Sequence, residues 1–371
     1  MTDVDIPALQ SAVAWAAFAL CFALGAVMRR TGFCTMGALA DIVNIGDWTR
    51  MRMWICAIGV AVLGTQLLAA TGLIDLDTSV YTAARFPWLS YVLGGLLFGF
   101  GMVLASGCGS KTLVRIGGGS LKSLVVFCVM GLFAYMTLRG VFGVARVAVV
   151  DPVAFTLAPG QDLPRLLAGA DGTGVDRIRL IAGGIVGLAL IGFAFAHREF
   201  RSPDAILGGV GVGLAIVGAW YISGHLGYVA EDPTTLEEKF VGTNSGRIES
   251  LSFVAPVAFT LDLLMFWSDT SRHVTLGVAA VAGMIAGAFA HAVASRQFRW
   301  EGFRDVEDTA NHLVGAACMG VGGVTALGCT IGQGLSGLST LALGSVLAFA
   351  ALLAGGMAGL KYQTWRVERL V

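Results

Sequence analysis

The chain has few charged residues. Asp, Glu, Lys and Arg make up only 13% of its 371 residues, whereas 56% are hydrophobic and the mean hydropathy is +0.79. A soluble globule of this length needs more polar side chains to cover its surface. This composition excludes a soluble protein and predicts an integral membrane protein.

Several sequence motifs for chemistry are missing as well. The sequence contains no C-x-x-C pair, and its five histidines fall mostly at the ends of apolar runs, where amphipathic side chains commonly settle. No G-x-x-x-x-G-K-[ST] phosphate loop is present, nor a glycosidase, protease or nucleic-acid-binding signature. We therefore expect no metal, no cofactor and no nucleic-acid partner, and we expect the protein not to be an enzyme.

Long apolar runs dominate what is present. A run of about 20 residues is long enough to cross a hydrocarbon core of roughly 30 Å as a helix. The sequence contains nine such runs: 11 to 28, 52 to 74, 89 to 107, 121 to 138, 178 to 196, 205 to 222, 274 to 294, 312 to 328 and 338 to 359. They predict an all-α membrane protein with about nine transmembrane helices, to which re-entrant or short helices are added.

The first apolar run has no basic residues before it, and no small-residue cleavage site follows it. A secretory signal peptide needs both features. We therefore expect this run to be a retained helix.

Basic residues are distributed unevenly between the runs, and cytoplasmic loops carry the excess of Lys and Arg. The N-terminus has none, which predicts that it lies outside, in the periplasm, and that the C-terminus is cytoplasmic. The loops expected inside contain Arg29, Arg30, Arg50, Arg52, Lys111, Arg115, Lys122, Arg198, Arg201, Arg296, Arg299, Arg304, Lys361, Arg366 and Arg369. This count works only if the apolar stretch 252 to 267 does not cross, so we interpret that stretch as re-entrant or lateral.

A ten-residue pattern, G-x-G-x-x-x-A-x-G-C, occurs twice, at 99–108 and 320–329. The predicted orientation makes the two copies antiparallel, and inverted repeats of this kind are a transporter architecture. At the same offset Asp41 matches Asp262, and Cys34 matches Ala255. We predict one integral membrane domain, 1–371, with an inverted pseudo-two-fold repeat: one half at about 11–138, the other at about 205–359, and a connecting segment at about 139–204.

The seven cysteines fall into two groups. Four lie within continuous apolar runs, where cysteine usually packs as a small hydrophobe: Cys21, Cys56, Cys128 and Cys318. The other three, Cys34, Cys108 and Cys329, are flanked by glycines that interrupt the helix. Non-helical backbone at membrane depth is tolerated only where protein or a polar cavity satisfies it, so these three are candidates for a substrate path.

A polar, glycine-rich stretch follows each repeat cysteine before the next helix begins. Backbone N–H groups at such a break, together with the positive end of the next helix, favour an anion. For Lys111 and Arg115 a role near the anion and a role as topology determinants remain equally open. The expected supporting residues of the path are Gly107, Gly109, Ser110, Lys111, Gly328, Thr330, Gly332 and Gln333.

Four stretches together resemble the YeeE/YedE sulfur-transport family, and the resemblance covers essentially the whole chain. They are Arg30–Cys34, Ala105–Gly109, Ala326–Gly334 and Val241–Ser250. The resemblance implies a bacterial inner-membrane protein that takes up thiosulfate. It also implies that Cys34, Cys108 and Cys329 line the centre of the membrane and pass the ion along by hydrogen bonds to its terminal sulfur.

A thiolate would repel such an anion, so the cysteines are expected to act as protonated thiols, which are weak donors and acceptors. The resemblance further implies a cytoplasmic sulfur-carrier protein as a partner. Two alternatives remain: transport of another sulfur or selenium species, and a membrane thiol or sulfane-sulfur oxidoreductase.

Overall fold

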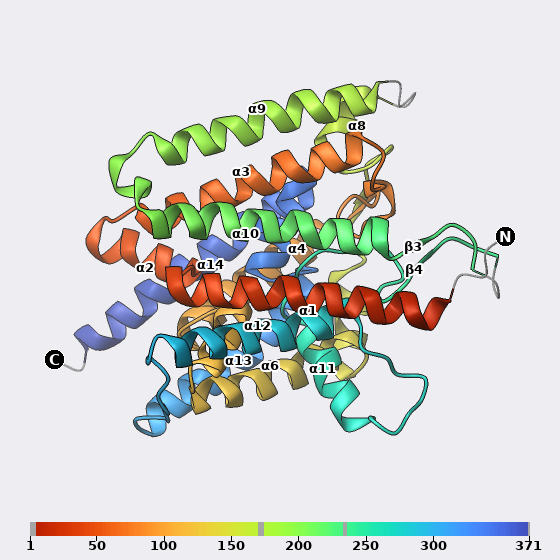
Figure 1. Cartoon of the computed structure of the whole chain (residues 1–371). Coiled ribbons are helices and arrows are strands. Elements are labelled where there is room, and N and C mark those ends of the chain that lie inside the picture. The colour runs from red at the N-terminus through yellow and green to blue at the C-terminus, as the bar shows by residue number, and fades with distance from the viewer. Residues whose placement is uncertain (1–4, 170–173, 233–235, 370–371) are drawn as a thin grey trace.

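The computed structural model describes residues 5–169, 174–232 and 236–369. Residues 1–4, from which we predicted that the first apolar run is a retained helix, lie outside the described residues. The structure is a bundle of long helices, with the N-terminus at one end and the C-terminus at the other (Figure 1). The long helices are α1 (Ile6–Thr31), α3 (Thr49–Ala70), α4 (Trp88–Leu104), α6 (Leu121–Leu138), α9 (Val175–Phe195), α10 (Pro203–Tyr221), α12 (Leu276–Ala294), α13 (Val306–Thr325) and α14 (Leu343–Glu368).

Shorter elements connect them. The short helices and single turns are α2 (Thr35–Ile45), η1 (Leu76–Thr78), α5 (Gly109–Gly117), α7 (Val141–Ala145), η2 (Arg146–Val150), α8 (Leu163–Ala168), η3 (Arg198–Arg201), η4 (Ile222–Leu226), α11 (Ala255–Met265) and η5 (Gly332–Gly337). Two antiparallel strand pairs lie at the end near the N-terminus: β1 (Arg85–Phe86) with β2 (Phe155–Thr156), and β3 (Tyr228–Val229) with β4 (Lys239–Phe240).

Each of the nine predicted runs coincides with a helix. Among the described residues, eight helical segments are long and apolar enough to cross a membrane. The ninth run, 312 to 328, falls on α13, which has 20 residues but begins with a polar turn containing Glu307 and Asp308. The all-α membrane fold is therefore confirmed.

The repeated pattern folds into the same turn twice. The run 89 to 107 was expected to reach Gly107, but α4 ends at Leu104 because the chain reverses at Ser106, whose φ is 56°. Leu327, at the matching position, has a φ of 57°. The closing N–H···O=C bond is 2.8 Å long in both copies, from Gly107 to Met102 and from Gly328 to Gly323. This bond pattern satisfies carbonyl groups at the helix end.

The two helices of the repeated pattern, α4 and α13, pack against each other in antiparallel directions. A Cβ atom built at Gly94 would lie 2.4 Å from the backbone nitrogen of Ala326, and one at Gly101 would lie 2.7 Å from the carbonyl oxygen of Gly315. Only residues without a side chain allow two backbones to approach this closely. Glycines along both helices, inside and outside the pattern, therefore allow α4 and α13 to pack this closely.

The stretch 252 to 267 contains the 11-residue helix α11, and α2 has the same length. At a rise of 1.5 Å per residue each is about 16 Å long, about half the thickness of a hydrocarbon core. Asp41 on α2 pairs with Arg50 at 3.3 Å, and Asp262 on α11 pairs with Arg272 at 2.7 Å. The two short helices thus share a length and an ion pair to the segment that follows.

The connections at the two ends of the bundle differ in charge. The basic connections after α1, α5, α9 and α12 gather at the end that holds the C-terminus, whereas the acidic segment around β3 and β4 lies at the end near the N-terminus (Figure 1). Helices that alternate in direction bring these loops to the same end. The charge asymmetry counted along the sequence is therefore an asymmetry of the folded bundle.

Candidate functional site

Each of the three singled-out cysteines lies directly before a helix. Cys34 precedes α2, Cys108 precedes α5, and Cys329 precedes the helical stretch 330–339 that contains η5. Their exposed fractions are 5%, 1% and 0%. The first N–H groups of a helix have no partner within it, and this end carries a partial positive charge. All three thiols are therefore buried beside the N–H groups and the positive potential of a helix start.

Backbone amides contact two of these sulfurs. The Sγ of Cys34 accepts the N–H of Gly37 at 3.4 Å. The Sγ of Cys329 accepts the N–H of Gly332 at 3.5 Å and that of Phe253 at 3.3 Å, the latter from the segment before α11. Cys329 is therefore contacted from two segments, the one before α11 and the one that follows α13.

Cys108 connects the other two cysteines. It is an electrostatic neighbour of both Cys34 and Cys329. A Cβ atom built at Gly109 would lie 2.7 Å from the carbonyl oxygen of Phe253, whose N–H contacts Cys329. Of the three sequence-predicted cysteines, Cys108 therefore lies near each of the other two.

Hydroxyl groups accompany the thiols. The Oγ of Ser110 lies 3.4 Å from the Sγ of Cys108. Thr35 and Thr330, which directly follow Cys34 and Cys329, are 1% and 0% exposed, and their hydroxyls have no hydrogen-bond partner within the described part of the chain. An unpaired buried hydroxyl costs about 1–3 kcal/mol. Two such groups beside two thiols can donate to an anion.

The structure separates the two basic residues that the sequence left equivalent. Arg115 donates to the carbonyl oxygen of Ser106 at 3.2 Å and pairs with Glu301 at 3.6 Å. Lys111 is half-buried and is an electrostatic neighbour of Cys34. Over the described residues, no ion pair of Lys111 is found within 4.0 Å. Arg115 therefore contacts other parts of the fold, whereas the charge of Lys111 lies near Cys34.

The remaining predicted support residues shape the turns. Cβ atoms built at Gly107 and Gly328 would lie 3.0 Å from Lys111 Cγ and 3.1 Å from Gln333 Cγ. A Cβ atom at Gly332 would lie 2.9 Å from Ser252 Oγ. The side-chain Nε2 of Gln333 donates to the carbonyl oxygen of Ala326 at 2.6 Å, closing the end of α13.

The other four cysteines differ in burial. Cys21 and Cys56 are fully buried inside α1 and α3, and Cys318 is half-buried on α13. Cys128 is exposed on α6, so the expectation that it packs in the interior is wrong. An apolar side chain on a membrane helix needs no protein partner, because lipid covers it equally well.

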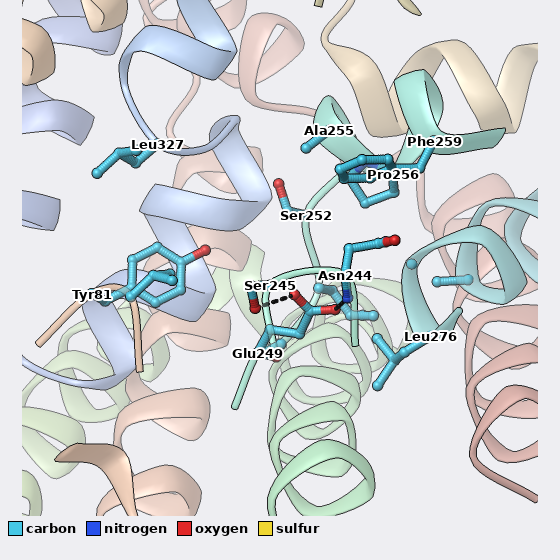
Figure 2. A pocket seen from close by; sticks show the side chains of 15 residues that line it. Tyr81, Asn244, Ser245, Glu249, Ser252, Ala255, Pro256, Phe259, Leu276 and Leu327 are labelled. Carbon is cyan, nitrogen blue, oxygen red and sulfur yellow. Dashed lines mark hydrogen bonds between the residues drawn. The ribbon is translucent and has the colours of Figure 1, made fainter. Parts of the chain in front are cut away.

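A cavity that the sequence did not predict lies next to Cys329. Figure 2 shows it between the segment 244–259, α12 and Tyr81. Its volume is about 130 Å³, and Ser252, which lines it, has its Oγ 3.9 Å from Cys329 Sγ. The Glu249 carboxylate also faces it and accepts the N–H of Asn244 at 3.3 Å and the hydroxyl of Ser245 at 3.1 Å. In the sequence this cavity is signalled by the polar stretch Val241–Ser250, one of the four stretches that resemble the sulfur-transport family.

The fold and this site define a multi-pass helical membrane protein whose interior contains buried thiols and hydroxyls at the N-termini of helices. The chain belongs to the sulphur transport family, whose sequence model matches residues 30–358. It is 29% identical over 321 residues to the thiosulfate transporter TsuA of Escherichia coli (strain K12), covering 84% of each chain. It is 24% identical over 347 residues to the thiosulfate transporter TsuA of Spirochaeta thermophila, covering 90% of this chain and 94% of that one.

Proposed function

We propose that the protein takes up thiosulfate across the bacterial inner membrane by passing the ion along Cys34, Cys108 and Cys329. The observation that carries this proposal is that Cys108 neighbours both other thiols, each at the start of a helix. Its family and the printed names of its relatives support a sulfur anion as the substrate and a transporter rather than an enzyme.

The chemistry of the groups suits transfer rather than tight binding. A dianion is costly in hydrocarbon, so its water must be replaced by donors along the path. Thiols and backbone N–H groups donate to the ion, and the hydroxyls of Thr35 and Thr330 provide further donors. Weak sites in series can hold an ion briefly and let it leave.

We infer that the bundle is an inverted repeat with one half at about 11–138 and the other at about 205–359. The antiparallel packing of α4 and α13, the matching turns at Ser106 and Leu327 and the matching short helices α2 and α11 support this inference. The basic end of the bundle then lies in the cytoplasm with the C-terminus, and the N-terminus lies in the periplasm.

The basic end is also where a cytoplasmic sulfur-carrier protein would receive the ion. Transport of a related sulfur or selenium anion would use the same groups, because soft terminal atoms suit thiols. A membrane thiol oxidoreductase would instead change the ion chemically.

Liposomes containing the purified protein distinguish these possibilities. We expect thiosulfate labelled at its terminal sulfur to accumulate inside as thiosulfate. Conversion to sulfite and a persulfide in proportion to protein would support the oxidoreductase and contradict the proposal. If a selenium analogue is taken up in preference to thiosulfate when both are present, the substrate would be the selenium ion, and the proposed path through the cysteines would stand.

A further inference from the structure

The cavity beside Cys329 is lined in part by an acidic side chain, that of Glu249. It opens among Asn244 and Ser245, which are exposed, and leads inward to Ser252 and the buried Cys329. Glu249 lies along this route (Figure 2). A carboxylate here would repel a dianion that approaches the first thiol. An anion path would not be expected to contain an acidic group that stays charged.

Resting on the function proposed above, we propose that this cavity is the outer binding site of the transported anion. We further propose that Glu249 must be protonated for the anion to bind, its carboxyl group then donating a hydrogen bond to the ion. The site would take a small oxyanion with a terminal sulfur together with one proton.

The surroundings of Glu249 favour such a proton. The carboxyl accepts only neutral donors among the contacts that are described, the N–H of Asn244 and the hydroxyl of Ser245. The residues of α11 and α12 that line the cavity are uncharged: Ala255, Pro256, Phe259, Leu276, Gly277 and Ala280. On its own segment and on η4 the nearest charged or titratable groups in sequence are Arg247 and His225, and both are exposed.

Tyr81 is the other titratable group that lines the cavity. It is an electrostatic neighbour of both Glu249 and Cys329, and burial raises the pKa of its phenol, so the hydroxyl stays a neutral donor. Burial likewise raises the pKa of the Glu249 carboxyl to about 7, against the lowering effect of the Asn244 and Ser245 contacts. Glu249 therefore changes charge in the physiological pH range.

Anion binding at this site is expected to weaken as the pH rises. Because the anion binds the protonated form, its affinity is highest below pH 7 and falls as the carboxylate forms above it. With a pKa near 7, the dissociation constant is expected to be about tenfold larger at pH 8 than at pH 6. Each ion bound at pH 8 should take up nearly one proton, because thiosulfate itself stays a dianion at both pH values.

Titration calorimetry of the full-length protein in nanodiscs with thiosulfate tests this inference. Runs at pH 6 and pH 8, in two buffers of different ionisation enthalpy, give the affinity and the proton uptake. Glu249→Gln keeps a donor but cannot titrate, so its affinity at pH 8 should equal that at pH 6. Glu237→Gln, an exposed residue at the same end of the bundle, should keep the wild-type pH dependence.

The inference is overturned if wild-type affinity is the same at both pH values with no proton uptake, or if it depends on sodium instead of pH. It is also overturned if Glu249→Gln keeps the wild-type pH dependence. The wild-type proton uptake is a test even if a variant misfolds. Absence of thiosulfate binding at every pH would overturn the proposed function, and this inference with it. Binding without pH dependence overturns this inference alone.

Discussion

Cys329 differs from a packed core cysteine in what its sulfur accepts. It receives two backbone N–H groups, from Phe253 and Gly332, although sulfur is a weak acceptor. Cys56 is equally buried but lies within α3, where the backbone N–H groups already bond within the helix. Burial alone therefore does not separate the two groups of cysteines, whereas their position at a helix start does.

Replacement of Cys108 or Cys329 by Ala should abolish growth of an uptake-deficient bacterium on thiosulfate as the sole sulfur source. The reason is that the proposed path then lacks the thiol of Cys108 or that of Cys329. Cys56→Ala is the matched control, because it removes an equally buried thiol inside a helix, and growth should continue. Growth of the Cys108→Ala strain with properly inserted protein would contradict the relay.

The hydroxyl of Thr330 gives a second test at this scale. Thr330→Val keeps the shape and removes an unpaired buried hydroxyl, so the thermal unfolding temperature should stay the same or rise. If the hydroxyl donates to the ion, thiosulfate uptake should fall about tenfold or more, as expected for a lost bond to a charged group. Thr330→Ser, which retains the hydroxyl, should keep uptake near the wild-type rate. A Val variant with wild-type uptake would assign the hydroxyl no part in transport.

At the scale of elements, the start of α5 depends on the absence of a side chain at Gly109. Its Cα lies so close to Phe253 that an added Cβ would be 2.7 Å from the carbonyl oxygen. Phe253 in turn holds Cys329. The contact between these two segments therefore sets the position of Cys108 relative to Cys329.

Gly109→Ala should disturb this contact. Forcing a methyl group into packed backbone typically costs about 1–3 kcal/mol, so we expect a lower unfolding temperature and a loss of most uptake. Gly184→Ala on α9 is the control, because no heavy atom other than local helix backbone lies within 4 Å of its Cβ position. It should leave uptake unchanged. Equal effects of the two substitutions, measured by thermal unfolding and uptake, would contradict the account of this contact.

The sequence predicted the elements well, and the reason is physical. Apolar runs must become helices in a membrane, because every backbone group has to be satisfied within the segment. Helix ends were less predictable: the run 89 to 107 was read as one helix, although the chain reverses at Ser106, a residue that rarely adopts positive φ. Glu249 could not be predicted either, since its segment has no periodicity and its role depends on neighbours from α11, α12 and Tyr81.

For the whole molecule, the two ends of the bundle have different charges and different ion pairs. Lys122, almost fully buried at the basic end, pairs with Glu301 at 2.9 Å and lies 4.0 Å from Asp308. These pairs join α6 to the segment before α13 and to α13 itself. Paired charges at this depth are tolerated because each has its partner.

The orientation predicted from this asymmetry can be measured with reporters. A green fluorescent protein fused after the C-terminus should be fluorescent in intact bacteria, because that end is predicted to be cytoplasmic. Alkaline phosphatase fused at the same place should be inactive. Active phosphatase and a dark fluorescent fusion would reverse the orientation, and the cavity beside Cys329 would then open toward the cytoplasm.

The charge count also shows what the sequence could predict of the whole molecule. The antiparallel order of the two patterns followed from counting basic loops, and α4 and α13 do pack in antiparallel directions. The distances among the three cysteines did not follow, because they depend on how the helix starts meet across the bundle.

In the proposed path, thiols recognise the terminal sulfur of the ion. This recognition is tested most directly by uptake of labelled thiosulfate into liposomes with excess sulfate, for the wild type and for Cys108→Ser. Sulfate has equal charge and similar size but lacks the soft sulfur, so we predict little competition, and serine, a harder and smaller donor, should impair transport nearly as much as alanine. Transport by Cys108→Ser at the wild-type rate, or competition by sulfate as strong as by unlabelled thiosulfate, would contradict the account.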